Sequence, residues 1–287
     1  MRLCLLFLTA FMAAPDITAA SAQQRPLVVY ISADMEGIAG LSSTDDPLGP
    51  RFMTAEVNAA IAGAFNAGAT RVTVNDAHGS HANLLVDQLD PRITLIRGSL
   101  KPYGMMQGLD STFSAVVFVG YHGRARTLGG FAAHTGSGTV ADLRINGTSV
   151  GEGGMNTLFA GWYGVPVAFI SGDSLAIAQQ RALTPGVVGV TVKAGIWDRA
   201  VRSLTPDSAR AAIQRGVEQA LRGAVARPAA LTRPIAVELD FSTAIYAEVA
   251  EGIPGVRRLG YATVSFSTPD YPAAYRMIRV LYRHLQP

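Results

Sequence analysis

The sequence has one cysteine, two lysines and no hydrophobic run long enough for a comfortable membrane span. Cys4 lies near the start of the chain, so the rest of the protein has no disulfide, no thiolate metal ligand and no cysteine nucleophile. The lysines are Lys101 and Lys193, and the other basic residues are scattered. The net charge is only +3, and no run of basic residues could bind along a phosphate backbone, so we expect no nucleic-acid partner.

Several common catalytic motifs are also missing. The stretch Gly151-Glu152-Gly153-Gly154 is rich in glycine but lacks the Lys-Ser/Thr pair of a P-loop. No G-x-G-x-x-G follows the first expected strand, which argues against dinucleotide binding.

The first residues have the pattern of a secretory signal peptide. Arg2 precedes an apolar run from Leu3 to Ala14, and Ala20-Ser21-Ala22 follows as an A-x-A cleavage site. We therefore expect residues 1–22 to be a signal peptide, and the mature protein to be periplasmic or secreted with no attachment to the membrane after cleavage. An uncleaved membrane anchor is the alternative, although the run is short for a span.

The rest of the chain reads as a folded α/β protein. Of the 287 residues of the full sequence, 49% are hydrophobic, which excludes a disordered or fibrous chain. Short apolar runs alternate with helical patterns, as βαβ units around a parallel sheet do. The expected strands are Leu27 to Ile31, Arg71 to Val74, Ile93 to Ile96, Ala115 to Val119 and Val167 to Ile170. The expected helices between these strands are Phe52 to Ala67 and Glu152 to Tyr163.

The texture of the sequence changes after Asp173. A long amphipathic helix is expected from Pro206 to about Leu221, strands over Ile235 to Phe241 and Ala262 to Phe266, and a last helix from Tyr271 to Leu285. We expect two parts: an α/β metal-binding catalytic domain over residues 23–175, with a largely parallel sheet flanked by helices, and a smaller α+β domain over residues 176–287 that serves oligomerisation.

Carboxylates and imidazoles follow the expected strands. Asp34 and Glu36 come after the first strand, His78 after the second and His122 after the fourth. In an open parallel sheet the ligand crevice lies beyond the carboxyl ends of the strands, so these groups are expected to meet. Asp34 and Glu36 are two residues apart, and an extended chain points them the same way.

Two carboxylates that face one point favour a divalent cation, since like charges in a shared site cannot both ionise cheaply. The mixture with His78 and His122 suits zinc or another borderline transition metal better than calcium or magnesium. Glu152, at a helix start, is a ligand, a base or an acid that stabilises the helix dipole. Each histidine has a structural alternative, but the convergence of all five residues favours a metal site. We expect Asp76 and Asp173 to orient imidazoles, with a helix cap as the alternative for Asp173.

At these residues the sequence resembles the D-aminopeptidase family of binuclear zinc peptidases. The segments that carry the resemblance are Ser32 to Ile38, Asn75 to Ser80, Gly98 to Asp110, Gly120 to His122, Ala133 to Thr135, Gly151 to Asn156, Gly164 to Val167, Ser171 to Asp173 and Ile253 to Val256. They span nearly the whole chain after the signal, in the same order.

The resemblance implies two zinc ions per subunit, held by Asp34, Glu36, His78, His122 and Glu152, with Asp34 bridging. It assigns a catalytic role to His134. It also implies hydrolysis of short peptides with an amino-terminal D-residue, such as D-Ala, by a metal-activated hydroxide, and a homo-oligomer in the form of a decameric ring. Preference for D- over L-residues rests on this resemblance alone. The expected export signal is a departure from the family, whose named member is similar to a cytoplasmic enzyme.

Two other functions use the same residues. A binuclear-metal esterase or phosphoesterase would need the same ligands, and would prefer ester or phosphate substrates. A non-catalytic exported protein that binds peptides would keep the crevice without turnover. The side chain of His134, which is not needed as a ligand in the implied scheme, argues mildly for catalysis.

Overall fold

The computed structural model describes residues 26–197, 199–224 and 226–285. The expected signal peptide, residues 1–22, lies outside these residues. Within the described part, no helix combines the length and the apolar character that crossing a membrane requires.

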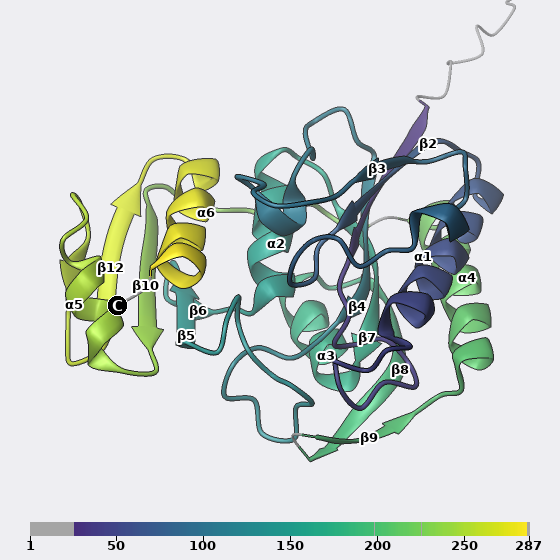
Figure 1. The fold of residues 1–287 in the computed structure, drawn as a ribbon. Helices are drawn as coiled ribbons and strands as arrows, with labels where there is room; N and C mark the ends of the chain where they lie inside the picture. Colours follow the sequence, from purple (N-terminus) through teal and green to yellow (C-terminus); the bar gives the residue numbers. More distant parts are fainter. Residues whose placement is uncertain (1–25, 198, 225, 286–287) are drawn as a thin grey trace, which may run out of the picture.

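A seven-stranded sheet forms the centre of the larger part of the molecule (Figure 1). Its strand order is β3-β2-β1-β4-β7-β8-β9, and every neighbouring pair is parallel except β8 and β9. The strands are β1 (Leu27–Ala33), β2 (Ala69–Asp76), β3 (Thr94–Ile96), β4 (Ala115–Tyr121), β7 (Val167–Asp173), β8 (Val188–Trp197) and β9 (Ala200–Ser203). This confirms the expected α/β class with a largely parallel sheet.

Helices cover both faces of this sheet. The helices are α1 (Gly49–Asn66), α2 (Glu152–Trp162), α3 (Ser174–Leu183) and α4 (Pro206–Arg222). Helices α1 and α4 pack on one face, α1 against β1, β2 and β4 and α4 against β7 and β8, with Met53, Ile61 and Ile213 fully buried. Helices α2 and α3 pack on the other face through Met155, Phe159 and Ile177, which share a core with alternate residues of β4. Each strand of the centre is therefore apolar on both sides, as buried parallel strands are.

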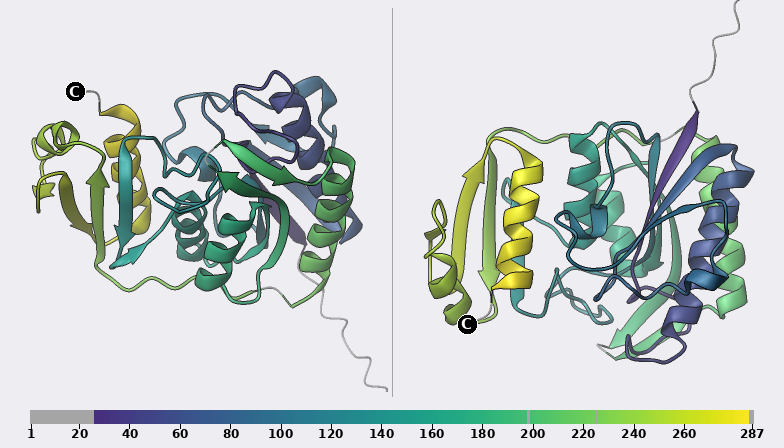
Figure 2. Two further views of the ribbon diagram at one scale, coloured as in Figure 1. Left: turned by 90° about the horizontal axis from the view of Figure 1, so that it is seen from below. Right: turned by 45° about the horizontal axis from the view of Figure 1, so that its top comes forward.

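A smaller antiparallel sheet stands beside this layer, with the order β11-β12-β10-β5-β6. Its strands are β5 (Val140–Ile145), β6 (Thr148–Ser149), β10 (Ile235–Phe241), β11 (Arg257–Arg258) and β12 (Thr263–Thr268). The remaining helices are α5 (Ala244–Ala250), α6 (Tyr271–Arg279), its π-helical continuation Val280–His284, and the short 3-10 turns Val86–Gln88 and Gly104–Met106. Helix α6 lies between the small sheet and α2, as Figures 1 and 2 show.

The two sheets do not follow the expected division at residue 175. Strands β5 and β6 precede that residue but pair in the small sheet, since Val140–Ile145 lies against Ile235–Phe241. Conversely, β8, β9 and α4 follow it but complete the large sheet and its helical cover. The chain thus passes between the two parts more than once, and the hydrogen bonds across nearly a hundred residues decide which sheet each strand joins.

Candidate metal centre

The ends of β1 and β4 approach each other closely at the proposed site. The backbone N–H of Asp34 donates to the carbonyl of Val119 (2.8 Å), and that of Gly37 donates to the carbonyl of Gly120 (2.8 Å). A Cβ on Gly37 would lie 2.2 Å from the Tyr121 carbonyl oxygen, and one on Gly120, where φ is +75°, 2.2 Å from that of Asp34. Only glycine fits here, because a side chain would push the two strand ends apart.

This approach brings the first three predicted ligands together. The Nδ1 atom of His78 lies 3.0 Å from Glu36 Oε2 and 3.3 Å from Asp34 Oδ1. His78 reaches them from the end of β2, whose next residue, Ala77, donates to the Ala33 carbonyl (2.8 Å). Asp34, Glu36 and His78 each offer a ligand atom, and these atoms lie within 4.8 Å of one another.

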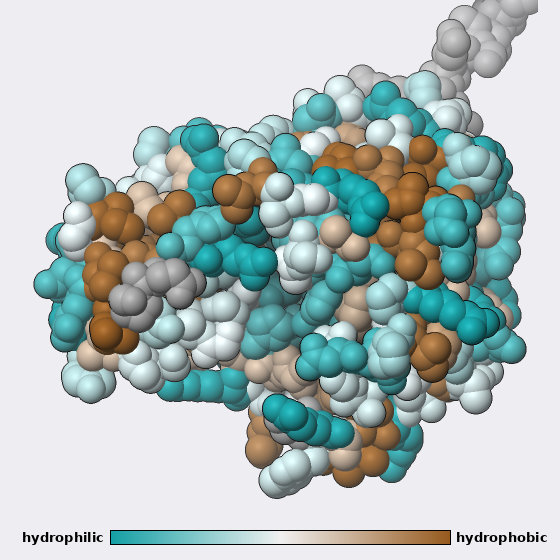
Figure 3. Space-filling view, in the orientation of Figure 1, coloured by the Kyte–Doolittle hydropathy of each residue, from teal (hydrophilic) through white to brown (hydrophobic). Residues whose placement is uncertain are grey.

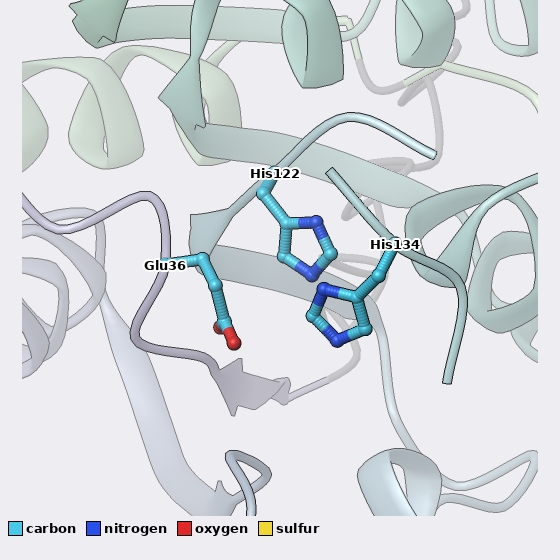
Figure 4. Close-up of side chains that lie close together, drawn as sticks. All are labelled: Glu36, His122 and His134. Atoms are coloured by element: carbon cyan, nitrogen blue, oxygen red, sulfur yellow. The ribbon is translucent and has the colours of Figure 1, made fainter. Parts of the chain in front are cut away.

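The other predicted residues complete the cluster. The Nε2 atom of His122 lies 3.3 Å from Glu152 Oε2 and 3.5 Å from Asp34 Oδ2. His134 places its Nε2 atom 3.3 Å from the other Glu152 oxygen, and its ring stacks on His122 with 4.3 Å between the ring centres. Figure 4 shows the two imidazoles side by side, with the Glu36 carboxylate reaching toward them. All six residues predicted from the sequence therefore meet in one place.

Hydrogen bonds to the backbone orient the two stacked imidazoles. His122 Nδ1 lies 2.9 Å from the Gly123 carbonyl oxygen, and His134 Nδ1 lies 2.9 Å from that of Ala132. A carbonyl only accepts, so Nδ1 carries the proton in both rings and a neutral ring presents its Nε2 lone pair to the carboxylates. Lone pairs and carboxylates that face each other require a proton or a metal ion between them.

The pKa values of the cluster also indicate that a proton or a metal ion lies between these groups. Burial and the neighbouring Glu36 raise the pKa of Asp34 to about 8. Although burial acts in the opposite direction, hydrogen bonds to Asp34 and Glu36 raise the pKa of His78 to about 11. Burial would also raise the pKa of Glu152, but His122 and His134 lower it to about 2. The Oδ2 atom of Asp34 is buried without a hydrogen-bond partner among the described residues.

These observations fit a metal site. Three carboxylates and three imidazoles, of which all but His78 and His134 are buried, supply the ligands that zinc prefers. Asp34 belongs to two of the groups that could hold an ion, one with Glu36 and His78 and one with His122 and Glu152. A third such group joins Glu36, His122 and His134, so His134 is also within reach of a ligand position, which the sequence had not indicated.

Neither of the two acids expected to orient imidazoles is hydrogen-bonded to an imidazole of a described residue, and the helix cap expected as the alternative for Asp173 is confirmed. Asp76 accepts hydrogen bonds from Asn83 and from the backbone N–H of Leu84, so it fixes the loop that begins at His78 and does not contact the ring. Asp173 caps α3 by accepting from the N–H groups of Leu175 and Ala176. Its other oxygen accepts from Gly123 N–H (3.0 Å), next to His122. The imidazoles of His122 and His134 are instead oriented by backbone carbonyls, which a sequence cannot single out.

Both lysines are part of the site's support, which the sequence analysis did not foresee. Lys193 is buried and donates to the carbonyl of Glu36 (2.7 Å), and Lys101 is buried and donates to the carbonyl of Asp76 (2.5 Å). Burial lowers the pKa of each to about 8. One feature of the sequence could have indicated this role: lysine occurs only at these two positions, and arginine is used everywhere else.

The cluster opens into a cavity of about 410 Å³. Asp34, Glu36 and Glu152 line part of it, and the C-terminal helix contributes Arg279, Tyr282 and Arg283. His81 also lines it, with Nδ1 buried and lacking a hydrogen-bond partner among the described residues. Burial and the neighbouring Lys101 and Arg279 lower the pKa of His81 to about 3. Nothing in the sequence pattern connects the C-terminal helix with the site.

Comparisons with known proteins agree with this geometry. The family model described as D-aminopeptidase matches residues 27–280. The D-aminopeptidase of Bacillus subtilis (strain 168) is 38% identical over 266 residues, which cover 88% of this chain and 96% of that protein. The solved structure of the Zn-dependent D-aminopeptidase DppA from Bacillus subtilis, described as a self-compartmentalizing protease, superimposes with a TM-score of 0.86 at 36% identity, over 89% of this chain and 96% of that one. The matched residues include the motifs at the strand ends that form the cluster, and this chain belongs to the D-aminopeptidase family.

Proposed function

We propose that this protein is a zinc-dependent aminopeptidase that removes an amino-terminal D-residue, such as D-Ala, from short peptides. In this proposal each subunit holds two zinc ions through Asp34, Glu36, His78, His122 and Glu152. Support comes from membership of the family and from the Zn-dependent relative. A short peptide is the substrate class that a cavity of about 410 Å³ accommodates.

One observation carries the proposal: the buried carboxylate of Asp34 is shared by two groups of ligand atoms. Its Oδ1 faces His78 and its Oδ2 faces His122, and Oδ2 has no hydrogen-bond partner among the described residues. A buried anionic oxygen without a partner is costly unless a cation is present. A carboxylate between two such groups is suited to bridging two metal ions.

Bound zinc would supply Lewis acidity at the scissile carbonyl and lower the pKa of water. The chain's own residues supply the rest. Glu152 is held by the N–H of Gly136 (2.7 Å), which fixes the oxygen that faces His134. His134 has the most exposed side chain of the cluster, at 29%, lines the cavity, and places its Nε2 3.3 Å from Glu152 Oε1. It is placed to hold a proton near Glu152 and to deliver it to the departing amine.

We also propose that the protein is exported and that it forms a homo-oligomer. The signal-peptide pattern over residues 1–22 supports a periplasmic or secreted location. The self-compartmentalizing relative supports an oligomer, and a decameric ring is the form implied by the family. Ile196 and Trp197 are exposed at the end of β8. The end of β8 lies at the lower edge of the molecule in Figure 1, where Figure 3 shows hydrophobic residues on the surface.

Hydrolysis of matched D- and L-aminoacyl dipeptides by the purified protein tests the proposed activity. The assay is run as purified, after a chelator, and after zinc is restored. Cleavage of the D-series that is lost with the chelator and regained with zinc is the expected result. A protein that retains zinc but cleaves neither series would contradict the aminopeptidase function, and ester and phosphate substrates would then be tested.

A further inference from the structure

Arg279 occupies an unusual position in the cavity that holds the metal cluster. Its side chain is buried, with the residue 5% exposed, yet no carboxylate of a described residue lies within 4.0 Å of its guanidinium. Its one hydrogen bond to a described residue goes from Nη1 to the Tyr282 hydroxyl (3.2 Å). A guanidinium has five N–H donors, so most of its capacity is unused. Arg279 lines the cavity, so its remaining donors are available to an anion that enters there.

The position is built to hold the guanidinium in place. Gly104, at φ +42°, leaves the space that the group fills, because a Cβ there would lie only 2.4 Å from Arg279 Cζ. On the other side Tyr282 packs against Gly136, where a Cβ would lie 2.7 Å from the tyrosine ring. Gly136 is the residue whose N–H holds Glu152. Arg279 is therefore linked to the metal cluster through two contacts, Tyr282 and Gly136.

The charges that line the cavity are separated by sign. The carboxylates come from the end of β1 and the start of α2, whereas the cations Arg279 and Arg283 come from the C-terminal helix. Arg283 donates to the carbonyl of Gly79 (2.8 Å) and is exposed, so it stands nearer to solvent. The unpartnered Nδ1 of His81 lies on the same cavity surface. A small zwitterion with an amino group at one end and a carboxylate at the other matches this separation.

We propose that Arg279 binds the free C-terminal carboxylate of the peptide substrate and so restricts the enzyme to short peptides. The proposal rests on the proposed function and adds a specificity residue to it. Guanidinium and carboxylate form paired hydrogen bonds of matching geometry. A peptide residue extends the chain by at most about 3.6 Å, so only peptides of one length place their carboxylate at Arg279 while the amino end lies at the metal cluster.

The test compares free peptides with their C-terminal amides, which lack the negative charge. Substrates are D-Ala-D-Ala and D-Ala-D-alaninamide, with matched acid and amide pairs of three and four residues. The zinc-loaded wild type is expected to prefer the acid by about 10- to 100-fold in kcat/KM at one length and less at the others. Arg279→Met is expected to bring that ratio close to one, mainly through a higher KM for the acid.

Controls separate this role from folding and from the proposed activity. Arg276→Met removes an exposed arginine of the same helix that does not line the cavity, and the acid-to-amide ratio should not change. If Arg279→Met does not fold, as judged by circular dichroism and zinc content, Arg279→Lys keeps the charge and should lower the ratio in part. An equal rate for acid and amide at every length, or an unchanged ratio in the Arg279 variants, would overturn the inference while leaving the proposed function intact. Absence of cleavage of every substrate would overturn both.

Discussion

His134 differs from the other residues of the cluster in exposure and in its contacts. Its side chain is 29% exposed, whereas that of His122 is 1% exposed and touches both Asp34 and Glu152. A buried residue that contacts two carboxylates is suited to a permanent ligand. A more exposed imidazole on the cavity side can exchange a proton with the substrate.

His134→Ala is therefore expected to retain zinc and to lose about 10²- to 10⁴-fold in kcat, the range typical of a lost acid or base. His122→Ala is expected to lose both zinc and turnover. Metal analysis and steady-state kinetics on the two variants provide the measurement. Loss of zinc from His134→Ala would instead make it a ligand, in line with its proximity to Glu36 and His122.

Zinc uptake is expected to release protons. In the absence of a metal ion, contacts with Asp34 and Glu36 raise the pKa of His78 to about 11 against the effect of burial, and Glu152 and the other carboxylates raise the pKa of His122. Both rings therefore carry a second proton at pH 7, which zinc must displace. Zinc affinity should rise with pH, and calorimetry in buffers of different ionisation enthalpy measures the protons released. His284→Ala, which removes an exposed imidazole, should leave that number unchanged.

Glu56 supplies a pH-dependent contribution to stability outside the metal cluster. It is buried, accepts one hydrogen bond from the Ala39 N–H (2.8 Å), and its Oε2 has no hydrogen-bond partner among the described residues. Burial raises its pKa from 4.5 to about 7. The folded protein keeps this proton between these two values when the unfolded chain has lost it, so this contribution to stability is full below pH 4.5 and is lost as pH rises through 7.

Glu56→Gln removes this titration. The free energy of unfolding of the variant, relative to wild type, should therefore shift in favour of the variant between pH 5 and pH 8, by at most about 3 kcal/mol. Urea denaturation at several pH values measures the difference. Glu248→Gln, which replaces an exposed carboxyl of α5, controls for the general loss of a negative charge. A difference that does not change with pH for Glu56→Gln would contradict the raised pKa.

Among the secondary-structure elements, the site depends on how closely β1 and β4 can meet. Gly120 combines φ +75° with a blocked Cβ position, 2.2 Å from the Asp34 carbonyl oxygen. Gly68, between α1 and β2, has φ +94° and no atom within 4 Å of its Cβ position. A substitution at Gly68 therefore tests backbone strain alone, whereas one at Gly120 tests backbone strain together with a steric clash.

Gly68→Ala is expected to destabilise the protein by about 1 to 2 kcal/mol, the cost of a left-handed backbone for alanine. Gly120→Ala should cost more than this, and it should also weaken zinc binding because the strand end that carries Asp34 must move. Thermal or urea unfolding and metal content distinguish the two effects. Equal destabilisation with full zinc retention in both variants would show that the close approach at Gly120 is not needed.

At the scale of the whole molecule, the described surface has apolar side chains gathered near β8. Leu128 is 92% exposed and Trp197 is 72% exposed, and the two line the same hollow. The segment around Leu128 packs on β8, since a Cβ on Gly195 would lie 2.2 Å from the Gly129 carbonyl oxygen. Exposed apolar patches of this kind are typical of subunit contacts.

Trp197→Glu is therefore expected to shift the proposed oligomer toward smaller species, because a charge would be buried in the contact. Tyr261, 81% exposed beside the small sheet, gives the matched variant Tyr261→Glu, which should leave the assembly intact. Sedimentation or light scattering measures the change in mass. Dissociation by Tyr261→Glu alone would move the contact to the small sheet.

The sequence by itself determined five of the seven strands of the large sheet, the helices α1, α2 and α4, and the residues that gather in the cluster, with the role of His134 implied by the family resemblance. These features are local: apolar runs define the strands, and Asp34, Glu36, His78 and His122 follow the strands directly, so the parallel order predicts their meeting. Only the tertiary structure decided that β5 joins β10 in a separate sheet, that carbonyls of Gly123 and Ala132 orient the imidazoles, and that Arg279 enters the cavity. Each of these depends on which distant segments pack together, and hydrophobic periodicity contains no information about such partners.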